Sequence, residues 1–144
     1  MARELLGHHN ITVVTNNMNV ANILTANESC EVIVAGGLLR RSDGGLVGDL
    51  TAQAIEAFKV DFAIIGTSAL DMDGDLLDFD AQEVRVSRAI IRQARKVFLV
   101  TDASKLRRSA PVKIGSLAEI DALFTDAPLP EALAAKCRDW ETGV

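Results

Sequence analysis

Small and polar residues follow each of five short apolar segments in this 144-residue chain. The clusters that they form are Asn16-Asn17, Gly36-Gly37, Gly66-Thr67-Ser68, Asp102-Ala103-Ser104-Lys105 and Thr125-Asp126. Glycine lets backbone N–H groups approach an anion closely, and the ammonium group of Lys105 can supply a full positive charge. These residue types therefore indicate a site for an anionic ligand, although turns and helix caps in α/β proteins use the same residues.

Two carboxylates near the start of a predicted helix are further candidates. Glu83 lies three, seven and eleven residues before Val86, Ile90 and Ala94, so it heads the apolar face of that helix. A carboxylate in this position is costly unless it is paired or faces a polar cleft. Asp80 lies just before it. Both acids can accept hydrogen bonds from a ligand, or they can simply complement the helix dipole.

Several common kinds of site are excluded by spacing. The chain has no GxGxxG or GxxxxGK[ST] motif, so we expect no nucleotide cofactor. The segment 71–75 resembles a calcium loop, but Leu76 stands at its glycine position and Gln82 at its twelfth position. Cys30 and Cys137 form no metal-binding cluster, and we expect neither a bound metal nor catalytic residues.

The composition narrows the function classes. Fifteen basic and twenty acidic residues give a net charge of -5, which disfavours binding to the negatively charged phosphates of nucleic acid. No apolar run approaches the roughly 18 residues of a membrane span, and the first residues do not resemble a signal peptide. With two cysteines and no disulfide framework, a reducing cytoplasm is the expected location.

The elements that would position these residues alternate between two kinds. Short β-branched runs predict five strands, at 11–15, 31–34, 61–65, 96–101 and 121–125. Their lack of alternation is typical of strands covered on both faces. Helical patterns lie between them, including 79–95 and a segment with Leu50, Ala54, Ala57 and Phe58 on one face. We predict one α/β domain over 1–144, a mostly parallel sheet with helices on both faces, whose carboxyl edge gathers the polar clusters.

A family resemblance rests on several motifs in fixed order. They are VVTNN at 13–17, VAGG at 34–37, GGLVG at 44–48, DFAIIG at 61–66, TDASK at 101–105 and FTD at 124–126. Together they resemble the C-terminal sensor domain of DeoR-family transcriptional repressors. The stretch 75–85 and the run 124–128 are most similar to the glycerol-3-phosphate branch of that family. The resemblance implies a fold related to ribose-5-phosphate isomerase and glucosamine-6-phosphate deaminase, a phosphorylated sugar or polyol as effector, and homo-oligomers, commonly tetramers.

The resulting hypothesis is an effector-sensing domain with glycerol 3-phosphate as the favoured ligand. The phosphate is expected near Asn16, Asn17, Gly36 and Gly37, with Lys105 opposite. Asp80 and Glu83 would accept hydrogen bonds from ligand hydroxyls, and Gly66 and Thr67 complete the predicted effector-binding set. Ligand binding would then shift an equilibrium that a DNA-binding domain shares.

Two departures from the family pattern are expected to matter. Nothing in the chain corresponds to the winged helix-turn-helix that reads operator DNA, and the Asp-x-Gly-Thr-Thr phosphate loop would lie upstream of residue 1. We therefore expect a fragment, an engineered piece or a mis-started reading frame, with operator binding only through the missing domain. Two alternatives stay open: a sugar-phosphate isomerase or deaminase that uses Glu83 or Asp80 as base, and an oligomerisation module with a vestigial cleft.

Overall fold

The computed structural model of this chain describes residues 2–144. They belong to two compact units, Met1–Ala57 and Phe58–Val144, and each unit has its own buried apolar residues. The prediction of a single domain over 1–144 stays a prediction.

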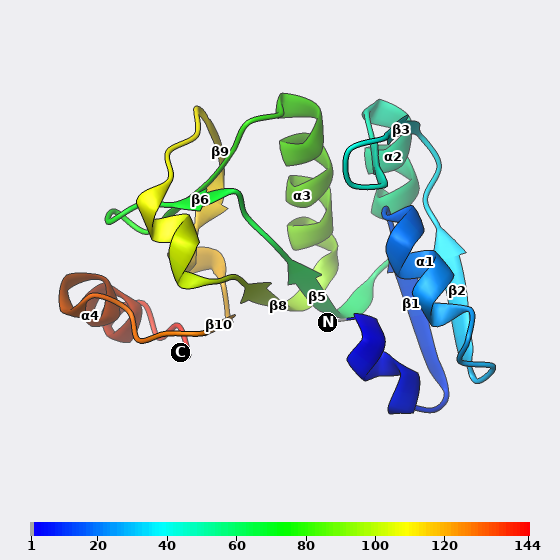
Figure 1. Cartoon of the computed structure of the whole chain (residues 1–144), viewed down its shortest axis with the longest axis horizontal. Coiled ribbons are helices and arrows are strands. Elements are labelled where there is room, and N and C mark those ends of the chain that lie inside the picture. Colours follow the sequence, from blue (N-terminus) through cyan, green and yellow to red (C-terminus); the bar gives the residue numbers. More distant parts are fainter. Residues whose placement is uncertain (1) are drawn as a thin grey trace. The chain divides into compact units, whose positions relative to one another are not determined.

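Unit 1 contains one parallel pair of strands and one hairpin (Figure 1). In β1 and β2, Ile11 lies opposite Cys30 and Thr15 lies opposite Val34. In β3 and β4, which are antiparallel, Leu38 lies opposite Val47. The elements of unit 1 are the 3₁₀ helix η1 (Ala2–Gly7), β1 (Ile11–Thr15), α1 (Met18–Leu24), β2 (Cys30–Val34), β3 (Leu38–Arg40), β4 (Gly45–Val47) and α2 (Asp49–Glu56).

The face that α2 buries differs from the prediction. Leu50, which the periodicity placed on the apolar face, is 71% exposed, whereas Thr51, Ala52 and Ile55 are buried. The reason is a close approach between α2 and the loop after β2. The hydroxyl of Thr51 donates a hydrogen bond to the carbonyl oxygen of Gly36, and this contact turns the Thr51 side of the helix inward.

Unit 2 contains a parallel sheet in the order β10-β8-β5 and an antiparallel sheet in the order β6-β7-β9. Its elements are β5 (Val60–Ile65), β6 (Ala69–Leu70), β7 (Asp75–Asp78), α3 (Ala81–Gln93), β8 (Ala94–Val100), the 3₁₀ helix η2 (Ala103–Arg107), β9 (Val112–Ser116), the 3₁₀ helix η3 (Leu117–Glu119), β10 (Ala122–Phe124) and α4 (Glu131–Asp139).

The predicted α/β class is confirmed. All five strands expected from the sequence are present, and all of them belong to the two parallel sheets. The long helix is shorter than predicted, because Ala94 and Arg95 already belong to β8. Their backbone groups pair with β5, where Val60 lies opposite Ala94, so strand pairing ends the helix.

The parallel sheet of unit 2 buries only one of its faces. Ala63, Val97 and Leu123 point into the core together with residues of α3, β9 and α4. On the opposite face, Phe62 is 60% exposed and Phe124 is 54% exposed. This differs from the prediction that the strands are covered on both faces. The chain moves across this sheet in one direction, from β5 to β8 and then to β10. Because crossovers between parallel strands are right-handed, both connections lie on the same face of the sheet and leave the other face uncovered.

The exposed face carries a row of aromatic rings. The ring of Phe98 stacks on that of Phe62 at a centroid distance of 5.6 Å and meets the ring of Phe124 edge-on at 5.8 Å. Ile64 and Val100 lie on the same face, at 42% and 37% exposure. A contiguous apolar surface of this kind is uncommon on a monomeric soluble protein.

Candidate functional site

In unit 1, the clusters Asn16-Asn17 and Gly36-Gly37 lie at the same edge of the β1–β2 pair. The two strands are parallel, and Thr15 lies opposite Val34, so both clusters follow the carboxyl ends of their strands. The backbone N–H of Ala35 still bonds to the carbonyl oxygen of Thr15 at 2.9 Å. The sequence prediction that these two loops meet is therefore confirmed within unit 1.

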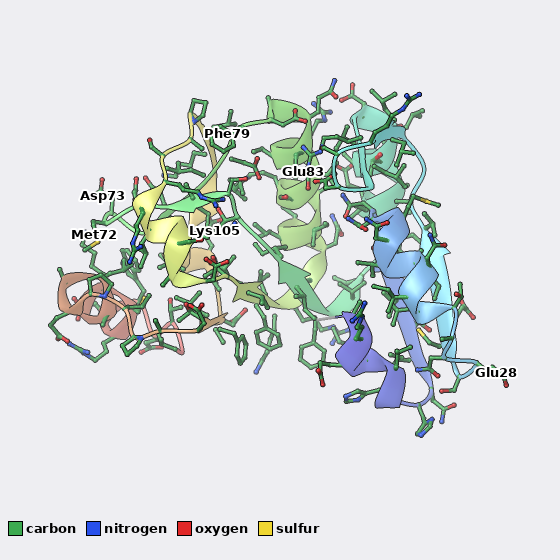
Figure 2. All side chains as sticks on the ribbon, in the orientation of Figure 1. Glu28, Met72, Asp73, Phe79, Glu83 and Lys105 are labelled. Atoms are coloured by element: carbon green, nitrogen blue, oxygen red, sulfur yellow. The ribbon has the colours of Figure 1, made fainter. Side chains whose placement is uncertain are left out.

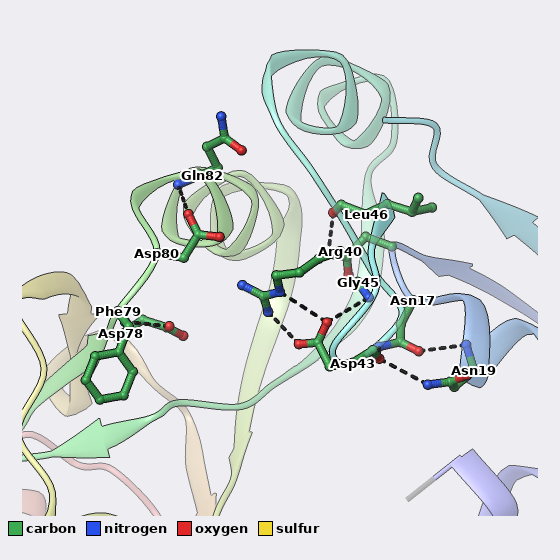
Figure 3. Close-up of polar contacts among 11 residues, drawn as sticks. Asn17, Asn19, Arg40, Asp43, Gly45, Leu46, Asp78, Phe79, Asp80 and Gln82 are labelled. Carbon is green, nitrogen blue, oxygen red and sulfur yellow. Dashed lines mark hydrogen bonds and ion pairs between the residues drawn. The ribbon is translucent and has the colours of Figure 1, made fainter. Parts of the chain in front are cut away.

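The two asparagines of this edge are held by hydrogen bonds inside unit 1, and Figure 3 shows the contacts around Asn17. The side-chain oxygen of Asn17 accepts bonds from the backbone N–H groups of Asn19 and Val20, which caps α1. The side-chain nitrogen of Asn16 donates to the carbonyl oxygen of Leu46 at 3.1 Å, and that of Asn17 donates to the carbonyl oxygen of Asp43. These contacts fix the loop after β1 against the β3–β4 hairpin.

The hairpin is itself fixed by an ion pair. The guanidinium group of Arg40 contacts the carboxylate of Asp43 at 2.5 Å, and Asp43 also accepts the backbone N–H of Gly45 at 3.0 Å. The hydrogen bond from Arg40 lowers the pKa of Asp43 below its usual value, and the N–H of Gly45 acts in the same direction. The carboxylate is therefore charged at neutral pH.

Gly37 is the glycine of this edge that the fold requires. Its φ is +138°, and a Cβ at this position would lie 1.8 Å from the hydroxyl oxygen of Thr51 and 2.9 Å from the carbonyl oxygen of Val47. No side chain fits there without a shift of backbone. Gly36, by contrast, has open space around the position of a Cβ.

In unit 2, three polar clusters follow the carboxyl ends of parallel strands. Ile65 and Leu123 both lie opposite Leu99, so β5, β8 and β10 end in register. A threonine follows each of these three residues by two positions: Thr67, Thr101 and Thr125. The strands therefore bring three threonines to one edge of the sheet, as the prediction of a common carboxyl edge requires.

The hydroxyls of two of these threonines have different surroundings. The Oγ1 atom of Thr67 lies 2.7 Å from the carbonyl oxygen of Ala69 and 2.9 Å from that of Leu77, so it bonds to the antiparallel sheet. The Oγ1 atom of Thr101 is buried, and no residue of the described chain forms a hydrogen bond with it.

The loop after β8 is organised by two aspartates. Asp102 caps η2, because its carboxylate accepts the backbone N–H of Ser104 at 2.9 Å and also the hydroxyl of Ser104. The bond from that hydroxyl is the main cause that lowers the pKa of Asp102. Asp126, after β10, accepts the backbone N–H of Ala103 at 2.8 Å. The loops after β8 and β10 are thus joined at this edge.

Lys105 follows on η2, and its side chain is half-buried. Within residues 2–144 its ammonium group takes part in no ion pair. Its charge is one of the causes that lower the pKa of Asp102. Figure 2 shows Lys105 and Glu83 on separate elements of unit 2.

Asp80 and Glu83 lie at the start of α3. The carboxylate of Asp80 caps the helix by accepting the backbone N–H of Gln82 at 2.9 Å (Figure 3). Glu83 is in the first turn, and its Oε2 atom is buried. Because α3 leads directly into β8 and runs antiparallel to β5 (Figure 1), its first turn lies toward the carboxyl ends of the strands.

The structure therefore gathers the predicted residues at two edges, one in each unit. In unit 1, the edge formed by the carboxyl ends of β1 and β2 holds Asn16, Asn17, Gly36 and Gly37. In unit 2, the corresponding edge of the parallel sheet holds Gly66, Thr67, Asp80, Glu83 and Lys105. Chemically, the edge of unit 2 offers the ammonium group of Lys105, the buried hydroxyl of Thr101, and the carboxylates of Asp80 and Glu83 beside those of Asp102 and Asp126. Cations, carboxylates and hydroxyls can form hydrogen bonds with a polyhydroxylated anion. The role of these nine residues in binding stays a prediction.

Thr101 and Asp126 were not among the predicted site residues. The sequence placed Thr101 in the strand 96–101 and in the TDASK motif, and Asp126 in a strand-end cluster and in the FTD motif. Thr101 follows the buried Leu99 by two residues, and this spacing places both side chains on the core face of the strand. Its burial depends on neighbours that are distant in sequence, so the sequence could not reveal it.

An open hollow of about 410 Å³ lies beyond β10. Phe124, Thr125, Asp126, Pro128 and Val144 are among its lining residues. None of the nine predicted effector-binding residues lines it. In the part of the chain that the structure describes, no group of three or more His, Cys, Asp or Glu residues is arranged to hold a metal ion. No helix among residues 2–144 is long and apolar enough to span a membrane.

Comparison with known proteins identifies the family. Residues 1–127 match the family described as the DeoR C terminal sensor domain. This chain belongs to that family. The membership confirms the resemblance seen in the sequence motifs, and it supports a sensor rather than an enzyme. The isomerase or deaminase alternative receives no support from it.

Curated relatives of this sensor domain are transcriptional regulators. The chain is 51% identical over 130 residues to the glycerol-3-phosphate regulon repressor of Escherichia coli K12, covering 90% of this chain and 52% of that protein. It is 45% identical over 142 residues to the protein of the same name from Haemophilus influenzae, covering 99% of this chain and 55% of the relative. The HTH-type transcriptional repressor CsqR of E. coli is 38% identical over 139 residues, 96% of this chain and 53% of CsqR. The chain thus spans about half the length of these relatives.

Among solved structures, the chain has a similarity to ribose 5 phosphate isomerase A from Neisseria gonorrhoeae. The TM-score is 0.38 with 12% sequence identity, and the match covers 73% of this chain and 50% of the isomerase chain. A TM-score of this size does not establish a shared arrangement of the elements. The α/β class stands on the strand pairing of this chain alone.

Proposed function

We propose that this sensor domain binds a phosphorylated sugar or polyol, with glycerol 3-phosphate as the favoured effector. The observation that carries the proposal is the 51% identity to a protein named as the glycerol-3-phosphate regulon repressor. The chemistry of the strand ends supports it, because Lys105 provides a cation for a phosphate and two carboxylates provide acceptors for hydroxyls. Asn16, Asn17, Gly36, Gly37, Gly66 and Thr67 belong to the same proposed set.

The proposed output is control of transcription. The effector would shift a conformational equilibrium that is shared with a DNA-binding domain of a longer protein, and couplings of this kind are typically about 1–3 kcal/mol. We place this protein in the cytoplasm, where a regulator of this kind meets both its effector and DNA. We also propose that the protein forms a homo-oligomer, either a dimer or a tetramer. The exposed apolar face of unit 2 supports this, because large exposed apolar surfaces are typical of protein–protein interfaces.

Thermal unfolding with and without ligand tests the proposal. A ligand that binds only the native state raises its stability by mass action. We expect millimolar glycerol 3-phosphate to raise the melting temperature more than equal concentrations of glycerol or inorganic phosphate. Equal shifts for all three compounds, or no shift for any, would contradict the polyol-phosphate proposal. Incubation with ribose 5-phosphate should give no turnover.

A further inference from the structure

The hydroxyl of Thr101 is the feature of unit 2 that the fold leaves unexplained. Its Oγ1 atom is buried, and no residue from 2 to 144 forms a hydrogen bond with it. Buried side-chain oxygens in native proteins are almost always hydrogen-bonded, because the loss of a water partner is costly. A valine has nearly the same shape and would avoid this cost, so packing alone does not call for a threonine here.

The position of Thr101 points to the carboxyl edge. Val97 and Leu99 are 4% and 0% exposed and face the core, and Thr101 continues this alternation on the same side of β8. Its backbone N–H bonds to the carbonyl oxygen of Phe124 at 3.0 Å, so the residue is held between the ends of β5 and β10. It directly precedes Asp102 and the η2 helix that carries Lys105.

We propose that Thr101 is an effector-contacting residue, whose hydroxyl forms a hydrogen bond with the phosphorylated polyol. This inference rests on the proposed function and adds a residue to it.

Thr101→Val tests the contact, because it removes the hydroxyl and keeps the shape. Calorimetric titration with glycerol 3-phosphate is expected to show about three- to tenfold weaker binding, as for one lost hydrogen bond. The melting temperature of the unliganded variant should stay the same or rise. Thr101→Ser, which keeps the hydroxyl, should retain most of the affinity.

Thr142→Val is the matched control. The hydroxyl of Thr142 is also buried, but it donates to the carbonyl oxygen of Leu117 at 2.7 Å. Its loss should lower the melting temperature and leave the affinity unchanged. If Thr101→Val lowers the melting temperature as Thr142→Val does, or binds glycerol 3-phosphate like the wild type, the inference is overturned. If the wild-type chain binds no glycerol 3-phosphate at all, the proposed function fails, and this inference fails with it.

Discussion

At the scale of single residues, Lys105 is expected to carry the phosphate contact. Hydrogen bonds to charged groups contribute about 1.5–3 kcal/mol, so Lys105→Ala should weaken glycerol 3-phosphate binding about tenfold or more in calorimetric titration. Lys113→Ala is the matched control. Lys113 pairs with Asp75 at 3.2 Å on the antiparallel sheet and belongs to no predicted contact. Equal affinities of the two variants would contradict the assignment of Lys105.

Glu83 is expected to act at the opposite end of the ligand. Glu83→Gln keeps the volume and one acceptor oxygen but removes the charge, so it should weaken glycerol 3-phosphate binding while sparing the binding of inorganic phosphate. If Glu83 only complements the dipole of α3, the substitution costs about 0.3–1 kcal/mol of stability and leaves the affinity alone. Titrations with both ligands, together with thermal melts, separate these outcomes.

Asp43 makes the stability of unit 1 depend on pH. Its pKa in the folded state is lowered, chiefly by the hydrogen bond from Arg40. The carboxylate therefore stabilises the fold above its unfolded pKa of about 3.9, and this contribution is lost as the pH falls through the lower folded value. Asp43→Asn should lower the free energy of unfolding at pH 7 by about 0.2–1 kcal/mol, as for an exposed ion pair. The difference from wild type should shrink toward pH 3.

The measurement for Asp43 is a series of urea unfolding curves between pH 7 and pH 3. The exposed Glu28 provides the control, and Glu28→Gln should leave the curves nearly unchanged. A difference between Asp43→Asn and wild type that is constant over the whole range would show that the ion pair with Arg40 is not its source.

At the scale of elements, β10 allows a direct test of the half-covered sheet. Leu123 is 1% exposed in the core, whereas its neighbour Phe124 is 54% exposed on the other face. Leu123→Ala should cost about 2–5 kcal/mol of stability. Phe124→Ala should cost about 0.5–1.5 kcal/mol, mainly through its edge-on contact with Phe98. Urea unfolding of the two variants measures both losses. Equal losses would mean that the face with Phe124 is covered in solution.

The elements also differ in how far the sequence predicts them. The five strands of the two parallel sheets are visible as β-branched apolar runs such as 11–15. The hairpin of β3 and β4 and the sheet of β6, β7 and β9 were not predicted, because their strands have two to five residues and little periodicity. The short strands are stabilised by pairing with distant partners, as when Asp75 lies opposite Ser116.

At the scale of the whole molecule, charge governs the interaction with DNA. The net charge of -5 opposes the attraction to phosphates that supports most DNA affinity. We expect no sequence-dependent shift of an operator fragment by this chain in a gel-shift assay at about 150 mM salt. A full-length glycerol-3-phosphate regulon repressor serves as the positive control. A shift that depends on the operator sequence would contradict this expectation.

The sequence by itself determined the class of the fold, the five strands of the parallel sheets and the residue types at the ends of these strands. Strand propensity and turn chemistry are local, so segments such as 61–66 and 101–105 indicate a strand and its polar end without knowledge of neighbours. The family motifs are also a property of the sequence alone. These features were sufficient to predict an α/β sensor with its polar residues at the carboxyl ends of parallel strands.

Only the tertiary structure decided which faces are buried and which polar atoms are satisfied. Leu50 is exposed because Thr51 bonds to Gly36, and Phe124 is exposed because both crossovers of its sheet lie on the other face. The Oγ1 atom of Thr67 bonds to Leu77, whereas that of Thr101 is buried without a protein partner among residues 2–144. Burial and hydrogen bonding depend on strand register and on contacts between residues far apart in the chain, which no local pattern specifies.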